Sequence, residues 1–361
     1  MNVAARHRLP RALVGAVSCW FLLAAAGVAH QPAPVPGEGA TPVADVGPAA
    51  TPEPAPTPLP PVVAADPYVL AFLNPYPANP FWQRARAAVE ARAVEDGVRV
   101  DVFDLATPSA ADQLAQMTEV VAAGYDGIIF GPLDAVGAAP AALAAAEAGV
   151  PLLALDTEPA AGRIVSLVGT DDVAAAAAGA AFIAAAIAGE GTVLDLRGDM
   201  TTAAAQDRER GLRTALARFP EIQVQAEDAA WDPSLALNLV EAALPPVVDG
   251  TPPAVGAGPS AIFAASDPMA LAALDVVFAA GREDLVVIGV GGTADALAAV
   301  ASGELTATVA EFPDRMGSLG VDLLVRHLNG EPVPPRVDSG FALVTLDNVE
   351  RFLDQESDVG G

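Results

Sequence analysis

From about residue 67 onward, short apolar runs alternate with longer stretches in which alanine and polar residues recur at helical spacing. Such runs are typical of strands buried on both faces of a parallel sheet, and the stretches between them are typical of the helices that cover it. The runs predict ten strands, at residues 68–73, 98–103, 127–130, 151–155, 164–168, 192–196, 222–225, 261–264, 285–290 and 306–310. Ten strands with their helices are more than one hydrophobic core accommodates, so the pattern predicts an α/β chain with two lobes.

The helical stretches show where several helices begin and end. They predict helices at residues 80–96, 110–123, 135–148, 172–188 and 267–280. Asp172 and Asp267 stand where an N-cap or a first-turn acid is expected. The glycine- and proline-rich segment 247–259 lacks this pattern and predicts a loop inserted at the surface.

Residues 1–29 have the three parts of a secretory signal: basic residues at the start, an apolar middle, and small residues at 27–29 where cleavage would occur. The sequence therefore predicts a periplasmic or extracellular protein. Two alternatives stay open, lipidation at Cys19 and retention of the leader as an anchor, because the apolar segment approaches the ~20 residues that span a bilayer.

Residues 30–66 contain 11 prolines, no basic residue and almost no large apolar residue. Such a segment cannot bury enough surface to fold, so it predicts a disordered linker. A polyproline II spacer would hold a folded unit away from a membrane or wall, which keeps the anchor alternative open.

Composition excludes several classes of function. The net charge of -27 argues against nucleic acid and anionic lipid as partners. All 18 basic residues are arginine, and P-loop ATPases and pyridoxal-phosphate enzymes both need a lysine. His327 is the only histidine beyond the leader and linker, so a Ser-His-Asp triad or a histidine zinc site is not expected. Cys19 is the only cysteine, which excludes an internal disulfide. We expect no catalytic residue, metal or cofactor.

Asn79-Pro80-Phe81-Trp82 lies at the junction between the first predicted strand and the first predicted helix. Open α/β sheets bind ligands beyond the carboxyl ends of their strands, and two adjacent aromatic rings there are poorly placed for a core. Flat rings beside an amide suit a sugar, which is apolar on its faces and polar at its rim. The alternative is a packed helix start with a hydrophobic staple.

Several segments carry a resemblance to a known family, and they occur in the family's order. They are the motif at 79–82, the strand 150–156 ending in Asp156, Asp207-Arg208-Glu209-Arg210-Gly211, Trp231, and the segments 265–270, 287–293 and 307–311. Over most of residues 67–346 the chain resembles the periplasmic ribose- and galactose-type sugar-binding proteins of bacterial ABC importers.

The resemblance implies two similar doubly wound parallel-sheet lobes, joined by a three-strand hinge, that close on a ligand. We expect the crossings near Thr170, Glu311 and Asp338. The implied divisions are an N-terminal lobe at 67–170 plus 312–338, a C-terminal lobe at 171–311 plus 339–350, and a tail at 351–361.

The resemblance also implies a ligand site without catalytic or metal-binding residues. Its members would be Asn79, Phe81, Trp82, Asp156, Arg208, Trp231, Ser266, Gly291 and Glu311. The carboxylate of Asp156 would accept hydroxyl hydrogen bonds, and the planar fork of Arg208 would donate them. By residue type alone, Asp156 suits a turn, Arg208 suits a surface ion pair, and Trp231 suits a core. Tyr76 suits a turn between prolines, with the cleft rim as the alternative.

Four positions depart from the ribose-type pattern. Thr157, Ser266 and Gly291 replace an arginine, an asparagine and an aspartate, and Glu311 replaces an amide. The shorter side chains at 266 and 291 enlarge the second-lobe half of the expected pocket, and Glu311 adds negative charge near Asp156. These changes favour a hexose-sized or larger polyol, an inositol or an amino-substituted sugar over ribose.

The sequence and the resemblance thus predict a solute-binding protein, not an enzyme, that delivers a carbohydrate or polyol to an ABC permease as a monomer. The alternative is a sensor that presents the same ligand to a membrane kinase or chemoreceptor. Lactose-type repressors share this fold, but they carry a DNA-binding helix-turn-helix where this chain has a signal and a linker.

Overall fold

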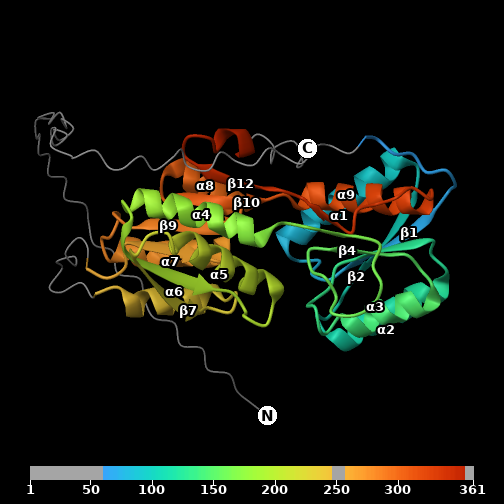
Figure 1. Cartoon of the computed structure of the whole chain (residues 1–361), viewed down its shortest axis with the longest axis horizontal. Helices are drawn as coiled ribbons and strands as arrows, with labels where there is room; N and C mark the ends of the chain where they lie inside the picture. The colour runs from blue at the N-terminus through green and yellow to red at the C-terminus, as the bar shows by residue number, and fades with distance from the viewer. Residues whose placement is uncertain (1–59, 246–256, 354–361) are drawn as a thin grey trace, which may run out of the picture. The chain divides into compact units, whose positions relative to one another are not determined.

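The computed structural model describes residues 60–245 and 257–353 (Figure 1). The predicted leader, most of the predicted linker and most of the predicted loop insertion lie outside these residues. Within the described part no helix is both long enough and apolar enough to cross a membrane.

The first lobe is built on a six-stranded parallel sheet in the order β11-β5-β4-β3-β1-β2. Its strands are β1 (Val69–Asn74), β2 (Arg99–Asp104), β3 (Gly127–Phe130), β4 (Leu152–Leu155), β5 (Leu167–Gly169) and β11 (Arg336–Asp338). Its helices are α1 (Pro80–Asp96), α2 (Ala110–Ala123), α3 (Ala139–Ala148) and α9 (Pro313–Leu328).

Alternate residues of β1 enter two different cores, because successive strand side chains point to opposite faces. Leu70 and Phe72 pack with α1 and α9, whereas Ala71 and Leu73 pack with α2 and α3. All four residues are fully buried. Helices therefore cover both faces of this sheet, which is why its strands read as continuous apolar runs.

The second lobe repeats this plan with the order β12-β10-β9-β8-β6-β7. Its strands are β6 (Glu190–Arg197), β7 (Glu221–Asp228), β8 (Ala261–Ala264), β9 (Val286–Gly291), β10 (Ala307–Glu311) and β12 (Phe341–Thr345). Its helices are α4 (Asp172–Ala186), α5 (Ala203–Leu216), α6 (Pro233–Ala243), α7 (Asp267–Ala279) and α8 (Ala294–Ser302). Only β12 runs antiparallel to its neighbour among these described strands.

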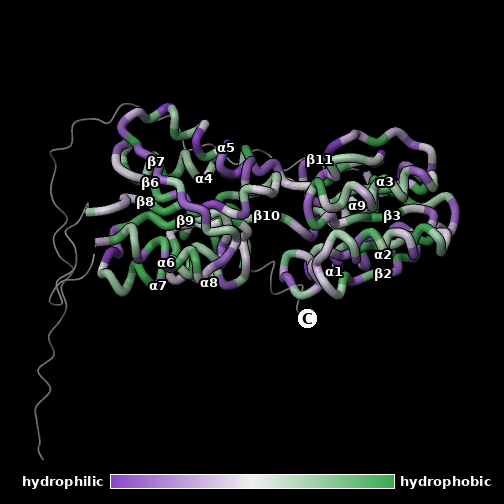
Figure 2. Tube along the Cα trace, turned by 90° about the horizontal axis from the view of Figure 1, so that it is seen from below, coloured by the Kyte–Doolittle hydropathy of each residue, from purple (hydrophilic) through white to green (hydrophobic). Residues whose placement is uncertain are grey.

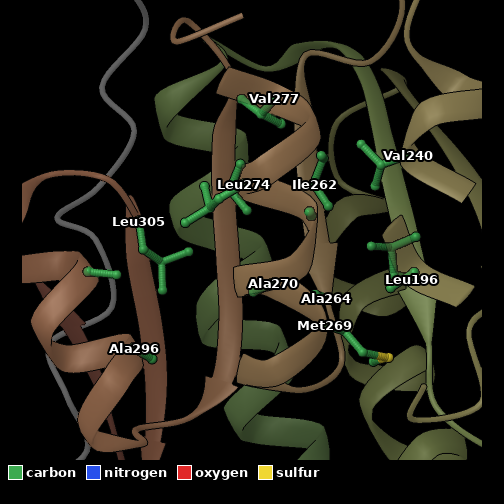
Figure 3. Packing of buried hydrophobic residues seen from close by; sticks show 14 of the residues in the cluster. Leu196, Val240, Ile262, Ala264, Met269, Ala270, Leu274, Val277, Ala296 and Leu305 are labelled. Atoms are coloured by element: carbon green, nitrogen blue, oxygen red, sulfur yellow. The ribbon is translucent and has the colours of Figure 1, made fainter. Parts of the chain in front are cut away.

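Two cores also flank the second sheet. Leu194 and Leu196 of β6 join the core under α6, α7 and α8, part of which Figure 3 shows around Met269 and Leu274. Val193 joins the core under α4 and α5. The apolar strands β8 and β9 are green in Figure 2. The predicted fold of two doubly wound α/β lobes is confirmed.

The chain passes between the two sheets three times: from β5 to α4, from β10 to α9, and from β11 to β12. The first and third crossings lie side by side. The Thr170 and Ser339 hydroxyl oxygens are 3.3 Å apart, and the Ser339 N–H donates to the Gly169 carbonyl at 2.9 Å. Arg315 on α9 donates to the Ser339 carbonyl at 3.1 Å, which ties the second crossing to the third.

Three details differ from the sequence predictions. Helix α3 begins at Ala139 instead of 135, because Asp134 accepts the Val136 and Gly137 N–H groups in a turn. Strands β11 and β12 were not among the predicted strands; β11 has a single apolar residue, Val337, and its place is set by pairing with β5.

The end of the predicted linker, residues 60–66, packs on the first lobe, so the prediction of a disordered segment was wrong for these residues. Val62 is 5% exposed and joins the core with α1 and α9. The Ala64 N–H donates to the Asp96 carbonyl at 2.8 Å, and the Asn329 side chain bonds the backbone of Val63 and Ala65. Burial of one valine and several backbone bonds orders a segment that composition alone assigns to the linker.

Candidate functional site

Asp156 follows the carboxyl end of β4 in a left-handed backbone conformation, with φ of 66°. This conformation is uncommon for a residue other than glycine and marks local strain that the surrounding structure must hold in place. The Asp156 N–H donates to the Val168 carbonyl at 2.7 Å, which ties the turn to β5. Among the described residues, the half-buried carboxylate accepts one hydrogen bond, from the Thr157 hydroxyl at 3.2 Å. Much of its accepting capacity remains for another group.

Arg208 on α5 joins three separate elements of the second lobe. Its Nε donates to Asp172 Oδ1 at 2.7 Å, its Nη1 to the Ala265 carbonyl at 2.7 Å, and its Nη2 to Glu311 Oε1 at 2.9 Å. Only 7% of the residue is exposed. Burial lowers the pKa of the Arg208 guanidinium, but the negative charges of Asp172 and Glu311 raise it by more, so the pKa lies above its ordinary value. The guanidinium stays charged and has two further N–H groups to offer.

Trp231 lies beside this guanidinium, with Arg208 Cζ 5.7 Å from the centre of the indole ring. This separation allows a cation–π contact. Trp231 is half-buried and has a φ of 64°, a strained value for an aromatic residue. Gly198 permits this placement, because a Cβ atom there would overlap the six-membered ring of the indole.

Three carboxyl groups surround Arg208, and burial raises the pKa of each. The pKa of Asp156 rises to about 6 through burial and then repulsion by Asp172, against the attraction of Arg208. The pKa of Asp172 also rises to about 6, from burial and the charge of Glu311. Burial raises the pKa of Glu311, with Arg208 acting against it. The charges of Asp156 and of the Arg208 network therefore act on one another, although Asp156 belongs to the first sheet and the others to the second.

The motif at residues 79–82 contributes more to the structure of the first lobe than its sequence indicated. Asn79 is the N-cap of α1, and its Oδ1 accepts the Phe81 N–H at 2.9 Å. Trp82 is 4% exposed and belongs to the core under α1 and α9, so the expectation that both rings avoid the core was wrong for Trp82. Its ring packs against Gly131, where a Cβ would lie 2.7 Å from Trp82 Cη2. Phe81 is half-buried and meets Trp82 edge to face at 5.7 Å between ring centres.

Ser266 and Gly291 frame the buried carboxylate of Asp267. Ser266 is the N-cap residue of α7, without a side-chain capping bond. Asp267 is fully buried and accepts hydrogen bonds from the Thr308 hydroxyl at 2.6 Å and the Thr293 N–H at 2.8 Å. Gly291 has a φ of 139°, and a Cβ there would lie 3.1 Å from Asp267 Oδ2. Asp267 therefore explains in part why residue 291 has no side chain.

The structure groups Asp156, Arg208, Trp231 and Glu311 through the contacts and charge interactions above. A separate hollow of about 570 Å³ lies beside β2 and α2 and includes none of the predicted site residues.

Two residues near the site were not among the predicted members. Asp172 was expected only at a helix start; Asp171 is the N-cap, and Asp172 in the first turn binds Arg208. The position of Asp172, two residues after the predicted crossing at Thr170, could have indicated this role. Tyr76 begins a turn, as expected, since its carbonyl accepts the Asn79 N–H at 3.0 Å. Burial and then the charges of Asp134 and Asp156 raise the pKa of its hydroxyl, so this side chain interacts electrostatically with Asp156.

Comparison with known proteins agrees with this architecture. Residues 70–332 match the family described as the periplasmic binding protein domain. The chain is 30% identical over 277 residues to the ribose import binding protein of Salmonella typhimurium, covering 76% of this chain and 88% of that protein. It is 32% identical over 281 residues to the D-allose-binding periplasmic protein of Escherichia coli, covering 74% and 87%.

A solved structure with the same fold is an ABC transporter periplasmic solute-binding protein from Actinobacillus succinogenes with bound D-allose. The TM-score is 0.70 at 23% identity, over 79% of this chain and 99% of that chain. At this identity the likeness concerns the fold alone.

Proposed function

Because the chain belongs to the family of periplasmic binding proteins, we propose that it binds a sugar or polyol between its two lobes and delivers it to an ABC importer. The relatives described above are named for ribose import and for D-allose binding, and they cover most of this chain. They do not favour the alternative of a sensor protein.

One observation carries the proposal: the carboxylate of Asp156 in the first lobe and the guanidinium of Arg208 in the second interact electrostatically across the crossings. A molecule with several hydroxyl groups can bond both, because each hydroxyl donates to a carboxylate and accepts from a guanidinium. Such a molecule links the lobes and stabilises their closure.

The proposed contacts follow from the chemistry of each side chain. Asp156 accepts from ligand hydroxyls, and the free N–H groups of Arg208 donate to them. Trp231 and the half-buried Phe81 offer ring faces to the apolar faces of a sugar. Asn79, Ser266, Gly291 and Glu311 complete the proposed site, and the buried Trp82 supports Phe81 from the core.

The remaining features of the protein are part of the same proposal. The leader is removed or kept as an anchor at the membrane, and the folded part acts outside the cytoplasm as a monomer that releases its ligand unchanged. The divisions between the lobes follow the crossings at residues 170, 311 and 338, and the partner that receives the ligand is a membrane permease.

A thermal-shift screen of the full-length chain against sugars and polyols tests this function, because a ligand that binds only the native state raises the melting temperature. Calorimetry should then give a Kd near 1 μM, or about -8 kcal/mol, for at least one compound. Asp156→Asn should weaken that binding, whereas Asp228→Asn at an exposed position of β7 should not. Absence of binding by every compound would refute the proposal.

A further inference from the structure

The groups around Arg208 carry more negative than positive charge. Asp156, Asp172 and Glu311 are three carboxyl groups, and Arg208 is the one cation that hydrogen-bonds to any of them among the described residues. Arg336 acts on Asp156 more weakly than Arg208 does, and it is exposed to water. Water screens the charge of an exposed arginine, so it compensates little.

Oxygen atoms of these carboxyl groups remain without partners in the described part of the chain. Arg208 occupies Oδ1 of Asp172 and Oε1 of Glu311, while Thr157 bonds Oδ2 of Asp156. The other oxygen of each group accepts no hydrogen bond there. Glu311 is only 7% exposed, so its Oε2 is an unpartnered acceptor on a side chain that is more than nine-tenths buried.

A ligand that closes the lobes removes water from these oxygens. A neutral sugar can donate hydroxyl hydrogens to them but leaves the excess charge uncompensated, which is costly in a dry site. An ammonium group supplies three hydrogen-bond donors and one positive charge. It therefore satisfies both the unpartnered oxygens and the charge.

We propose that the ligand is an aminated sugar or polyol whose ammonium group is held between Asp156 and Glu311. This inference rests on the proposed function and narrows its ligand class. Glu311 is then a specificity-determining residue: it holds Arg208 with one oxygen and recognises the cation with the other.

Matched ligand pairs test the inference on the full-length chain at about pH 7. The pairs are glucosamine with glucose, galactosamine with galactose, and scyllo-inosamine with scyllo-inositol, and the N-acetylated amines serve as uncharged amide controls. Bonds to a charged donor are stronger than bonds between neutral groups, so calorimetry should show about tenfold tighter binding for at least one amine than for its hydroxyl counterpart.

Glu311→Gln removes the charge and keeps the shape and the acceptor for Arg208. It should reduce the amine preference by about tenfold, to near parity. Glu304→Gln, at an exposed position of the same lobe, changes the net charge equally and should leave the preference intact. If Glu311→Gln does not fold, as judged by thermal unfolding without ligand, Asp156→Asn makes the same test.

The outcomes separate the two proposals. Neutral sugars that bind as tightly as their amines would overturn the ammonium site while the proposed function stands. Retention of the amine preference in both Glu311→Gln and Asp156→Asn would overturn the assignment of the ammonium site to Asp156 and Glu311. Failure of every amine and every neutral compound to bind would overturn the proposed function together with this inference.

Discussion

Nη2 of Arg208 lies 2.9 Å from Oε1 of Glu311, so a residue of α5 is joined to the end of β10, two residues before α9 begins. Both side chains are at least nine-tenths buried. The ion pair thus connects a proposed ligand contact with one of the crossings between the lobes. A ligand that competes for either partner would act directly on a segment that joins the two lobes.

Arg208→Ala should destabilise the protein by about 3 kcal/mol, because it leaves the carboxylates of Asp172 and Glu311 buried without their cation. Urea unfolding of the purified chain measures this change. Arg210→Ala is the matched control on the same helix. Arg210 is exposed and pairs with Asp207 at the surface, so the control should change stability by less than about 0.5 kcal/mol. Equal losses in the two variants would contradict the buried-pair account.

Asp195→Asn should stabilise the protein at neutral pH and flatten its pH dependence. Asp195 is 1% exposed, its Oδ2 has no partner among the described residues, and burial and then Glu209 raise its pKa to about 7. The folded state therefore binds a proton more tightly than the unfolded state, whose pKa is near 3.8. The free energy of unfolding must fall as pH rises from about 4 to about 7, by roughly 2–4 kcal/mol from this group.

Urea midpoints at pH 4.5, 6 and 7.5 test the Asp195 prediction. The variant should lose less stability than the unsubstituted protein over this range. Glu221→Gln, at an exposed carboxylate of the neighbouring strand β7, should follow the unsubstituted protein. Parallel pH curves for all three proteins would show that Asp195 does not titrate in this window.

Gly198→Ala should displace the indole of Trp231 and weaken ligand binding, because the added Cβ occupies space that the ring fills. Overpacking of this kind costs about 1–3 kcal/mol of stability. In a Trp231→Ala background the clash is gone, so the same substitution should have little effect. A double-mutant cycle by urea unfolding measures the difference. If Gly198→Ala costs the same stability in both backgrounds, the ring is not the obstacle.

A chain that begins at residue 67 should be about 2 kcal/mol less stable than a chain that begins at residue 60. The longer deletion exposes the pocket of Val62 and breaks the backbone bond from Ala64 to Asp96. Thermal and urea unfolding of the two shortened chains check this. Val62→Ala in the chain that begins at residue 60 should reproduce part of the loss, and equal stability of the two shortened chains would contradict it.

The local pattern of apolar residues was sufficient to predict most of the strands in the two sheets. The runs at 127–130 and 261–264 were predicted with the bounds of β3 and β8, because a strand covered on both faces must be apolar throughout. Strand β11 does not carry that signal, whereas β12 contains the apolar run 341–344, which was not among the predicted strands. The place of β11 at an edge of the first sheet and of β12 at an edge of the second follows from pairing with partners far along the chain, which no local window contains.

For the candidate site, too, the sequence predicted some features and long-range packing decided the others. The sequence alone determined the alternating α/β order, the two lobes, and the positions of Asp156 and Glu311 at strand ends, whereas Arg208 lies within α5. Tertiary structure decided that Trp82 enters a core and that Asp172 shares Arg208 with Glu311. The physical reason is that apolar periodicity is a local property of the chain, whereas burial of a ring and pairing of charges depend on which distant segments pack together.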